Sequence, residues 1–196
     1  MISSIFNQAA AIINKPSEPV VCDSVAGLND DFDAARYMGT RYEIYHTQNQ
    51  PFQSDDAKCV DALYSNLDAS TGKFTVYNSS KGNSYGKRKG ITGTGWCPET
   101  EEEGQCFVKF FFWQKWPKNP NYQIVDTDYE TYSIVYSCDP DDMQYLWFLA
   151  RTPTISDELD AELHAKALMY LPNYETENLI KDDQDPVKCG YTESMQ

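Results

Sequence analysis

The stretch DTDYETYSIVYSC, residues 126–138, decides the fold. From Tyr129 onward, aromatic and β-branched residues fill most positions, and the run stops at Cys138. Such side chains favour strands, and the polar residues before them are typical of a turn. Because apolar residues occupy successive positions, both faces of this strand must be covered. Cys138 would then anchor the end of the strand to another part of the chain.

Further strands are predicted wherever short apolar and aromatic runs lie between turn residues. They span residues 40–47, 58–66, 73–78, 84–95, 105–113, 121–126 and 144–151, and the stretch quoted above supplies 131–138. Gly72, Gly82 and Gly104 mark turns between these runs. The run 84–95 is itself rich in glycine, which predicts a weak and bent strand.

After the strands the period of the apolar residues changes, which predicts one amphipathic helix over residues 156–169 with Ser156 as its N-cap. The apolar stripe of this helix consists of Leu159, Leu163, Ala167 and Leu168. Eight short strands followed by a helix predict an all-β fold, an eight-stranded antiparallel up-and-down barrel with this C-terminal helix packed outside. A helix on the barrel wall would cover the outer face of the strand 131–138 and explain its apolar character.

The length of 196 residues fits one domain with a core of its own. We expect the barrel domain to span residues 22–190, between an N-terminal extension (1–21) and a tail (191–196). The apolar positions of residues 1–13 follow helical spacing, which predicts a short amphipathic helix in the extension. A segment without fixed structure and the remains of a leader peptide are the open alternatives.

The net charge of −14 argues against binding to nucleic acid or to anionic membrane surfaces, because both require clustered Lys and Arg. The chain contains no run of about 18 apolar residues, so no membrane span is predicted. Aromatic residues make up 14% of the chain, which suits β structure better than a helical bundle.

The six cysteines are an even number and predict three disulfides, an oxidising compartment and therefore a secreted protein. They form no C-x-x-C pair, and His46 and His164 have no metal-ligand spacing, so no metal is expected. Spacing alone leaves all fifteen connectivities of six cysteines open. Cys97 and Cys106 are near enough in the sequence to close one hairpin.

Three motifs together resemble the structurally conserved regions of the lipocalin family. They are FDAARYMGTRYEIY (32–45), TDYETYSIVYSC (127–138) and LARTP (149–153), in the order that the family shows. Within lipocalins the pattern is most similar to the branch of apolipoprotein D, insect biliproteins and crustacyanins, and the second motif looks most like the crustacyanin type. The resemblance implies the disulfides Cys22–Cys138 and Cys59–Cys189, and leaves Cys97–Cys106 as the third.

One position departs from the family pattern. Lipocalins usually carry Gly-x-Trp in the first motif, whereas Arg41 stands here at the Trp position. The resemblance places Arg41 beside Arg151 at the closed end of the barrel, where two buried guanidinium groups would repel each other. We expect a carboxylate to neutralise them, with Asp30, Asp31 or Asp128 as candidates.

The resemblance also implies that the barrel carries a small hydrophobic ligand. The likeness to crustacyanins favours a carotenoid similar to astaxanthin, with a biliverdin-type tetrapyrrole or a colourless fatty acid or sterol as alternatives. The residues expected to contact the ligand are Trp147, Phe110, Phe112, Tyr136, Tyr132, Tyr145 and His46. Trp147 stands where relatives of apolipoprotein D place a pocket Trp, and alternation around Lys109 would turn the two Phe side chains inward. His46 ends the first strand and would donate to a ligand oxygen.

Other functions make different demands on the sequence. A tetrapyrrole could place its propionates on the basic cluster 87–89, and a cationic amine would need Glu43 or Asp61 to point inward. Enzymatic activity is not expected, because every cysteine has a plausible partner and neither histidine adjoins a nucleophile. Association with a second copy or with another lipocalin subunit would use an aromatic surface that includes Trp116 and Tyr122.

Overall fold

A computed structural model of the protein describes residues 20–25, 28, 32–82, 86–98, 104–139 and 143–191. The helix expected in residues 1–13 and the tail residues 192–196 lie outside these ranges. Tyr191 is buried, and its ring centroid lies 4.8 Å from that of Tyr42. The packed part of the chain therefore continues one residue past the expected domain end at residue 190.

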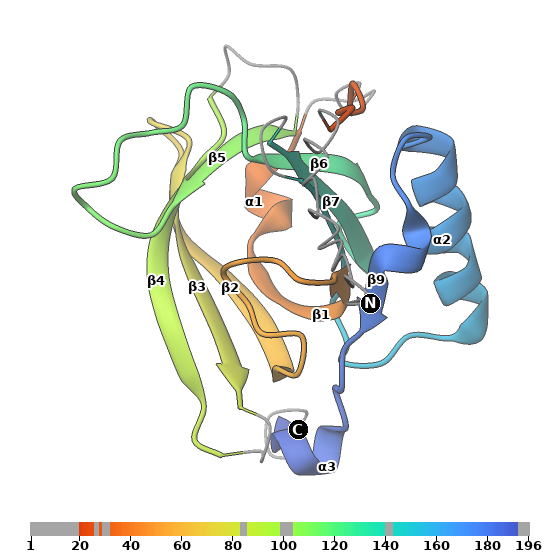
Figure 1. The fold of residues 1–196 in the computed structure, drawn as a ribbon. Coiled ribbons are helices and arrows are strands. Elements are labelled where there is room, and N and C mark those ends of the chain that lie inside the picture. The colour runs from red at the N-terminus through yellow and green to blue at the C-terminus, as the bar shows by residue number, and fades with distance from the viewer. Residues whose placement is uncertain are drawn as a thin grey trace, which may run out of the picture.

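Eight antiparallel strands close into a barrel (Figure 1). They are β1 (Gly39–Thr47), β2 (Lys58–Asp68), β3 (Lys73–Lys81), β4 (Lys89–Trp96), β5 (Gln105–Lys109), β6 (Tyr122–Thr127), β7 (Tyr132–Cys138) and β8 (Gln144–Ala150). Each strand pairs with the next one along the chain, and β1 pairs with both β2 and β8, so the sheet closes on itself. The predicted fold is confirmed, although β4 begins at Lys89 and β5 ends at Lys109, so that both strands are shorter than expected.

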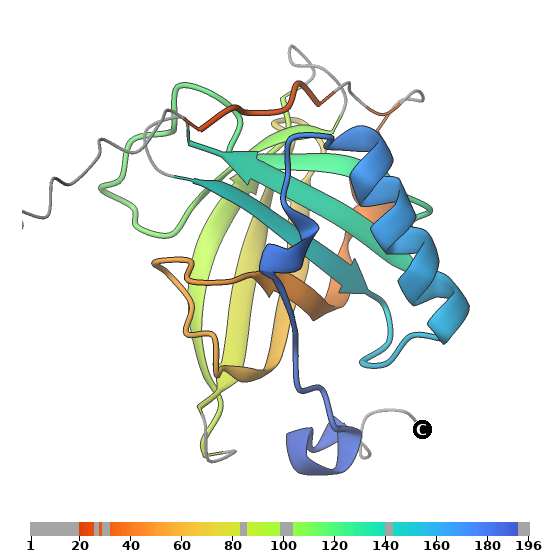
Figure 2. The same cartoon turned by 45° about the vertical axis from the view of Figure 1, so that its right-hand side comes forward.

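The barrel is accompanied by one long helix and several short elements. The long helix is α2 (Asp157–Tyr170), and the short elements are α1 (Ala34–Tyr37), η1 (Thr176–Asn178), β9 (Leu179–Lys181) and α3 (Pro186–Cys189). Figure 2 shows α2 lying across the outside of the barrel, as predicted. Its N-cap Ser156 accepts a hydrogen bond from the backbone N–H of Leu159 at 3.2 Å. In the described part of the chain, no helix combines the length and the apolar character needed to cross a membrane.

The outer faces of β7 and β8 pack against α2, and this explains why the deciding strand is apolar on both faces. Leu163 and Ala167 of the helix are buried in one cluster with Ile134 of β7 and Phe148 of β8. On the other face of β7, the hydroxyl of Ser133 forms a hydrogen bond with α1 inside the barrel. Alternate residues of β7 therefore serve the helix interface and the barrel interior.

Removing the buried helix contact should be costly. Leu163 is fully buried, so Leu163→Ala should lower the free energy of unfolding by about 2–5 kcal/mol. Leu168 was predicted to share its stripe but is 57% exposed, because it lies about 100° around the helix axis from Ala167. The control Leu168→Ala should cost less than about 1 kcal/mol. Denaturant unfolding of both variants measures the difference, and equal losses would contradict this packing.

All six cysteines form disulfides, in the pairs that the resemblance implied. They are Cys22–Cys138, Cys59–Cys189 and Cys97–Cys106. The first ties the segment before α1 to the end of β7, which is the anchor expected for Cys138. The second joins β2 to α3, and the third closes the connection between β4 and β5.

A C-terminal strap, residues 179–184, completes the barrel wall between β1 and β2. The two strands pair with each other up to Tyr42, and beyond this point β9 lies beside β1 in place of β2. Nε2 of Gln184 donates to the backbone carbonyl of Glu43 on β1 at 2.8 Å and to that of Val60 on β2 at 2.6 Å. The strap thus bonds to both strands where they separate.

The two arginines at the closed end lie in different surroundings. Arg151 donates to backbone carbonyls of Arg36, Tyr37, Thr40 and Tyr129. Burial, followed by the nearby Arg41, lowers the pKa of Arg151. Arg41 is fully buried with its guanidinium 4.1 Å above the ring of Tyr37, and no described residue forms a hydrogen bond with it. The carboxylate of Asp128 accepts bonds from its own turn instead, and residues 30–31 lie outside the described ranges.

Candidate ligand-binding site

Three aromatic side chains form a group beside the barrel wall: Tyr145 and Trp147 on the face of β8 that does not meet α2, and Phe52, which is 64% exposed. Trp147 and Tyr145 of β8 stack with their ring centroids 6.0 Å apart. Phe52, from the β1–β2 loop (48–57), lies 5.2 Å from the Tyr145 ring and 6.1 Å from the Trp147 ring. Trp147 pairs across the sheet with His46 of β1, which places these two side chains on the same face. Two predicted ligand contacts therefore lie together, joined by a loop residue that was not predicted.

Tyr132 and Tyr136, two further predicted contacts, lie on the opposite face of the sheet. Both belong to the cluster that packs against α2. The Tyr132 hydroxyl donates to Asp126 at 3.0 Å, and the Tyr136 hydroxyl donates to Gln144 at 2.8 Å. The choice of face was wrong for these two residues, because alternation alone does not say which face of β7 the helix covers.

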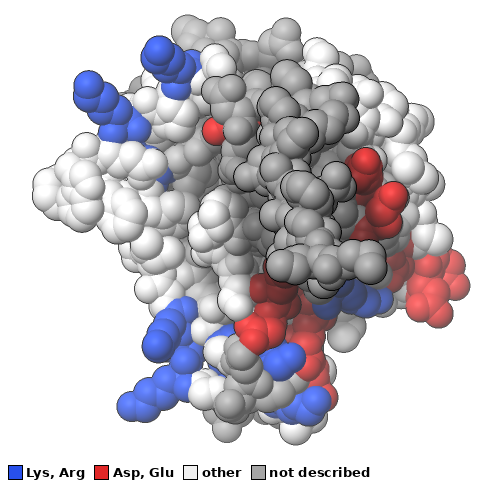
Figure 3. All heavy atoms as spheres, viewed as in Figure 1, with Lys and Arg blue, Asp and Glu red and all other residues white. Residues whose placement is uncertain are grey.

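The two predicted Phe contacts also separate. Phe110 is partly buried against the interior cluster that includes Val108. Phe112 is 89% exposed, because β5 has ended at Lys109 and the side chain of Gln114 accepts a hydrogen bond from the N–H of Phe110 as the chain turns. The β5–β6 loop projects from the barrel as an uncharged tip (Figure 3). The expected inward position of Phe112 was therefore wrong.

A group of tyrosine hydroxyls lies in the interior near α1. Tyr122 forms hydrogen bonds with Tyr37 and Tyr64, each at 2.8 Å. Tyr122 had been expected on an outer assembly surface, but this hydrogen-bonded group places it inside. Trp116 remains near the surface, where its ring lies 5.5 Å from that of Trp96. The tyrosine hydroxyls near α1 and the aromatic group of Phe52, Tyr145 and Trp147 are therefore two separate groups.

In the basic cluster 87–89, Arg88 forms hydrogen bonds with residues of β2. Nη1 of Arg88 donates to Asp61 at 2.6 Å and to the carbonyl of Cys59 at 3.0 Å. Burial raises the pKa of Asp61, while Ser79 and Arg88 act in the opposite direction. Because Asp61 already has a cationic partner, it is a poor candidate for binding an amine ligand.

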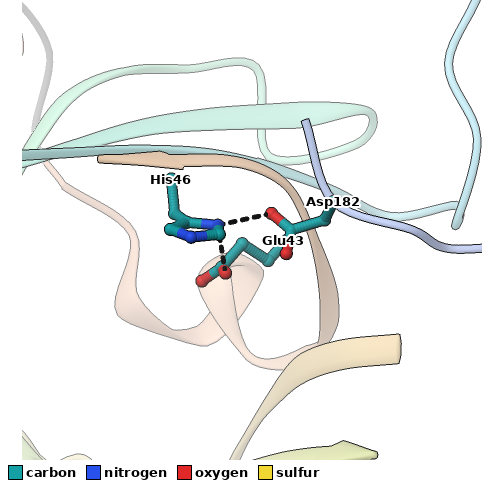
Figure 4. A group of neighbouring side chains, drawn as sticks. All are labelled: Glu43, His46 and Asp182. Atoms are coloured by element: carbon teal, nitrogen blue, oxygen red, sulfur yellow. Dashed lines mark hydrogen bonds and ion pairs between the residues drawn. The ribbon is translucent and has the colours of Figure 1, made fainter. Parts of the chain in front are cut away.

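His46 is fully buried in a group with Glu43 and Asp182 (Figure 4). Its Nδ1 lies 3.0 Å from Oδ2 of Asp182 and 3.3 Å from Oε1 of Glu43. Its Nε2 lies 3.8 Å from Oδ1 of Asp55 in the β1–β2 loop. The predicted ligand donor His46 therefore faces carboxylates inside the wall instead of standing at an opening.

A register shift in β1 brings the first two of these residues together. Glu43 pairs with Leu149, and His46 pairs with Trp147. The two partners are two positions apart on β8, whereas Glu43 and His46 are three positions apart on β1. The extra residue in this bulge turns Glu43 and His46 to the same face, where regular alternation would oppose them. Asp182 then arrives from the strap, 136 residues later than His46.

Burial raises the pKa of both carboxyl groups well above their usual values. For Glu43, the next cause is the neighbouring Asp182 carboxylate, while His46 and a hydrogen bond from Nε2 of Gln53 act in the opposite direction. For Asp182, the hydrogen bond with Glu43 and the charge of Lys58 oppose the effect of burial. The two carboxyl groups therefore hold a proton to higher pH than free carboxyl groups do, and a cation that binds between them would replace that proton.

Comparison with known proteins gives one family model, a lipocalin-like domain that matches residues 32–184. Apolipoprotein D of Bos taurus is 30% identical over 166 residues, which cover 83% of this chain and 81% of the relative. Outer membrane lipoprotein Blc of Escherichia coli K12 is 34% identical over 159 residues, which cover 81% of this chain and 84% of the relative. Lazarillo protein of Schistocerca americana is 36% identical over 127 residues, covering 62% of this chain and about half, 53%, of the relative.

Solved structures share the fold. Insecticyanin from the tobacco hornworm Manduca sexta superposes with a TM-score of 0.70 at 24% identity, covering 87% of this chain and 90% of that one. Lobster apocrustacyanin A1 gives a TM-score of 0.63 at 20% identity, and the match covers 85% of this chain and 89% of that one. At these identities the likeness concerns the arrangement of the strands and not the ligand.

Proposed function

Since this chain belongs to the lipocalin family, we propose that it carries a small hydrophobic ligand in its barrel and that this ligand is a carotenoid. Members of this family are generally carriers and not enzymes. The three disulfides support a role outside the cell, where such bonds persist. Association with a further subunit remains a prediction of the sequence resemblance.

The aromatic group beside the barrel wall supports a flat or elongated conjugated ligand. Phe52, Tyr145 and Trp147 present three rings whose centroids lie between 5.2 and 6.1 Å apart. Such rings bind conjugated molecules through dispersion and offset stacking, without requiring a charge on the ligand. A carotenoid is long and nearly neutral, so it matches this surface.

An acidic ligand is the second candidate, and a separate observation favours it. The guanidinium of Arg41 is fully buried, and within the described chain it contacts the ring of Tyr37 but has no hydrogen-bond acceptor. A buried charge without a partner is costly, so a ligand carboxylate near Arg41 would relieve that cost. A fatty acid or a tetrapyrrole with propionates would supply such a group.

Replacing Trp147 should weaken ligand binding. Trp147→Ala should raise the Kd for a carotenoid such as astaxanthin by about 10- to 100-fold, because about 1.5–3 kcal/mol of apolar contact is lost. Trp116→Ala is the matched control, because Trp116 packs on Trp96 instead of on the aromatic group. Titration of the purified protein, followed by the visible spectrum of the carotenoid, measures both Kd values. Equal weakening in the two variants would contradict the proposed position of the ligand.

The identity of the ligand is tested on protein from its native source. A visible band that changes on denaturation to that of a free carotenoid supports the proposal. Release of a tetrapyrrole on denaturation, or a colourless extract that contains fatty acid, supports the acidic-ligand alternative. In that case Arg41→Gln should weaken binding of the ligand. A colourless sterol, or no ligand in the extract together with no binding of astaxanthin, overturns the carotenoid proposal.

A further inference from the structure

We propose that Glu43, His46 and Asp182 form a site for one divalent transition-metal cation of the zinc type. One ligand atom from each residue lies within 4.8 Å of the other two, and all three residues are buried. Figure 4 shows the imidazole and the two carboxylates turned toward one another. The site adjoins the aromatic group, because His46 pairs with Trp147, but it shares no side chain with that group and does not depend on which hydrophobic ligand the barrel carries.

The distances match the edges of a metal coordination shell. Zinc binds imidazole nitrogen and carboxylate oxygen at about 2.0–2.2 Å, so neighbouring ligands of a tetrahedral ion lie about 3.3 Å apart. Nδ1 of His46 lies 3.3 Å from Oε1 of Glu43 and 3.0 Å from Oδ2 of Asp182. Imidazole favours zinc, copper, iron or nickel over magnesium and calcium, which prefer oxygen ligands alone.

The group contains polar atoms that the protein itself leaves unused. Within the described residues, Oδ1 of Asp182 and Nε2 of His46 are buried and have no hydrogen-bond partner. Glu43 and Asp182 place two acidic side chains next to each other in this buried group. A divalent cation would balance both charges at once and remove the cost of burying them.

Residues of the β1–β2 loop surround the three proposed ligands. Nε2 of His46, the ring nitrogen that is not directed at Glu43 and Asp182, lies 3.8 Å from Oδ1 of Asp55, which is beyond hydrogen-bond distance. That oxygen is itself held by the backbone N–H of Asn49 at 2.8 Å. Nε2 of Gln53 donates to Oε1 of Glu43 and fixes its orientation. The β1–β2 loop therefore holds one of the proposed ligands, Glu43, by a hydrogen bond from Gln53.

Calorimetric titration with Zn²⁺ alone, on protein treated with a chelator and then freed of it, tests the site. The wild type should bind one ion, and His46→Gln should weaken binding by about 100-fold or more. His164→Gln is the matched control, because His164 also lies beside a carboxylate, 3.4 Å from Asp160, but on α2. Thiols do not compete for zinc, because all six cysteines are in disulfides.

A second variant and a second metal keep the test decisive if His46→Gln fails to fold. Asp182→Asn preserves the size of the side chain and should lose Zn²⁺ binding as well. Co²⁺ should give the visible absorption of a tetrahedral site in the wild type and in His164→Gln, and not in Asp182→Asn. No binding by the wild type, or binding that survives both His46→Gln and Asp182→Asn, overturns the proposal. Either result leaves the proposed carriage of a hydrophobic ligand untouched.

Discussion

Raising the pH from about 10 to about 12 should steeply lower the free energy of unfolding, because several tyrosine hydroxyls keep their protons to higher pH in the folded protein than in the unfolded chain. Burial raises the pKa of four tyrosines to about 12; they are Tyr132, Tyr136, Tyr174 and Tyr191. A tyrosine in an unfolded chain has a pKa of about 10. All four tyrosines are buried, with exposed fractions of 6% or less.

The direction of the effect follows from proton binding. Between pH values of about 10 and 12 the folded protein keeps protons that the unfolded chain has released, so the free energy of unfolding falls as the pH rises. The stabilising contribution is complete below about pH 10 and is lost as the pH rises through about 12. Each tyrosine adds a slope of at most about 1.4 kcal/mol per pH unit, so the four together remove at most about 10 kcal/mol, and less to the extent that solvent screens their hydroxyls. This upper limit is comparable with the whole stability of a domain.

Tyr136→Phe isolates one of these contributions. The Tyr136 hydroxyl donates to Gln144 at 2.8 Å and accepts from the N–H of Asp23 at 3.1 Å, so its loss should cost about 1–2 kcal/mol near neutral pH. Above about pH 10, however, the stability of this variant should fall less steeply, by about 1.4 kcal/mol per pH unit. Tyr77→Phe, which removes the hydroxyl of a 38% exposed ring, is the control and should keep the wild-type slope. Denaturant titrations over a pH series measure the slopes, and identical slopes in all three proteins would refute the explanation.

Replacing Cys59 and Cys189 together by Ser should lower the free energy of unfolding by about 4–5 kcal/mol. These cysteines are 130 residues apart, so their bridge removes much of the conformational freedom of the unfolded chain. The bridge also fastens α3, and with it the strap, to the start of β2. Its loss should therefore loosen the wall beside Glu43 and Gln184.

The short bridge provides the comparison. Cys97 and Cys106 are only 9 residues apart, and their double replacement by Ser should cost about 3 kcal/mol or less. Denaturant unfolding gives both values, and hydrogen exchange of the backbone amides in residues 179–184 should increase only in the Cys59/Cys189 variant. Equal losses of stability, or strap amides that remain protected, would count against this role of the strap.

Much of the fold follows from local sequence patterns. The run 131–138 ends in a cysteine and is apolar at successive positions, and this requires a strand covered on both faces. Ser156 and the Leu163–Ala167 spacing then identify the helix that covers one of them. These features are short-range, so alternation and capping are sufficient to recognise them.

The candidate site was less predictable, for two physical reasons. A bulge turns His46 to the same face as Glu43, and no property of residues 43–46 alone indicates where a strand will gain a residue. Asp182 directly follows the three-residue strand β9, which is too short to give a periodic signal. Phe112 was misplaced because β5 ends four residues earlier than the apolar run 105–113, where Gln114 caps the turn. Alternation along β7 separates its two faces but does not say which of them meets α2, because that contact depends on the tertiary structure.

The strap also sets a time order on biosynthesis. His46 and Asp182 are neighbours in the wall but are 136 residues apart, so on the order of ten seconds of ribosomal synthesis separates them. During that interval the part of β1 after Tyr42 and the part of β2 before Asp61 lack the segment that later lies between them. Unpaired edges of this kind invite association with other chains. The barrel wall is therefore complete only after translation has passed the strap.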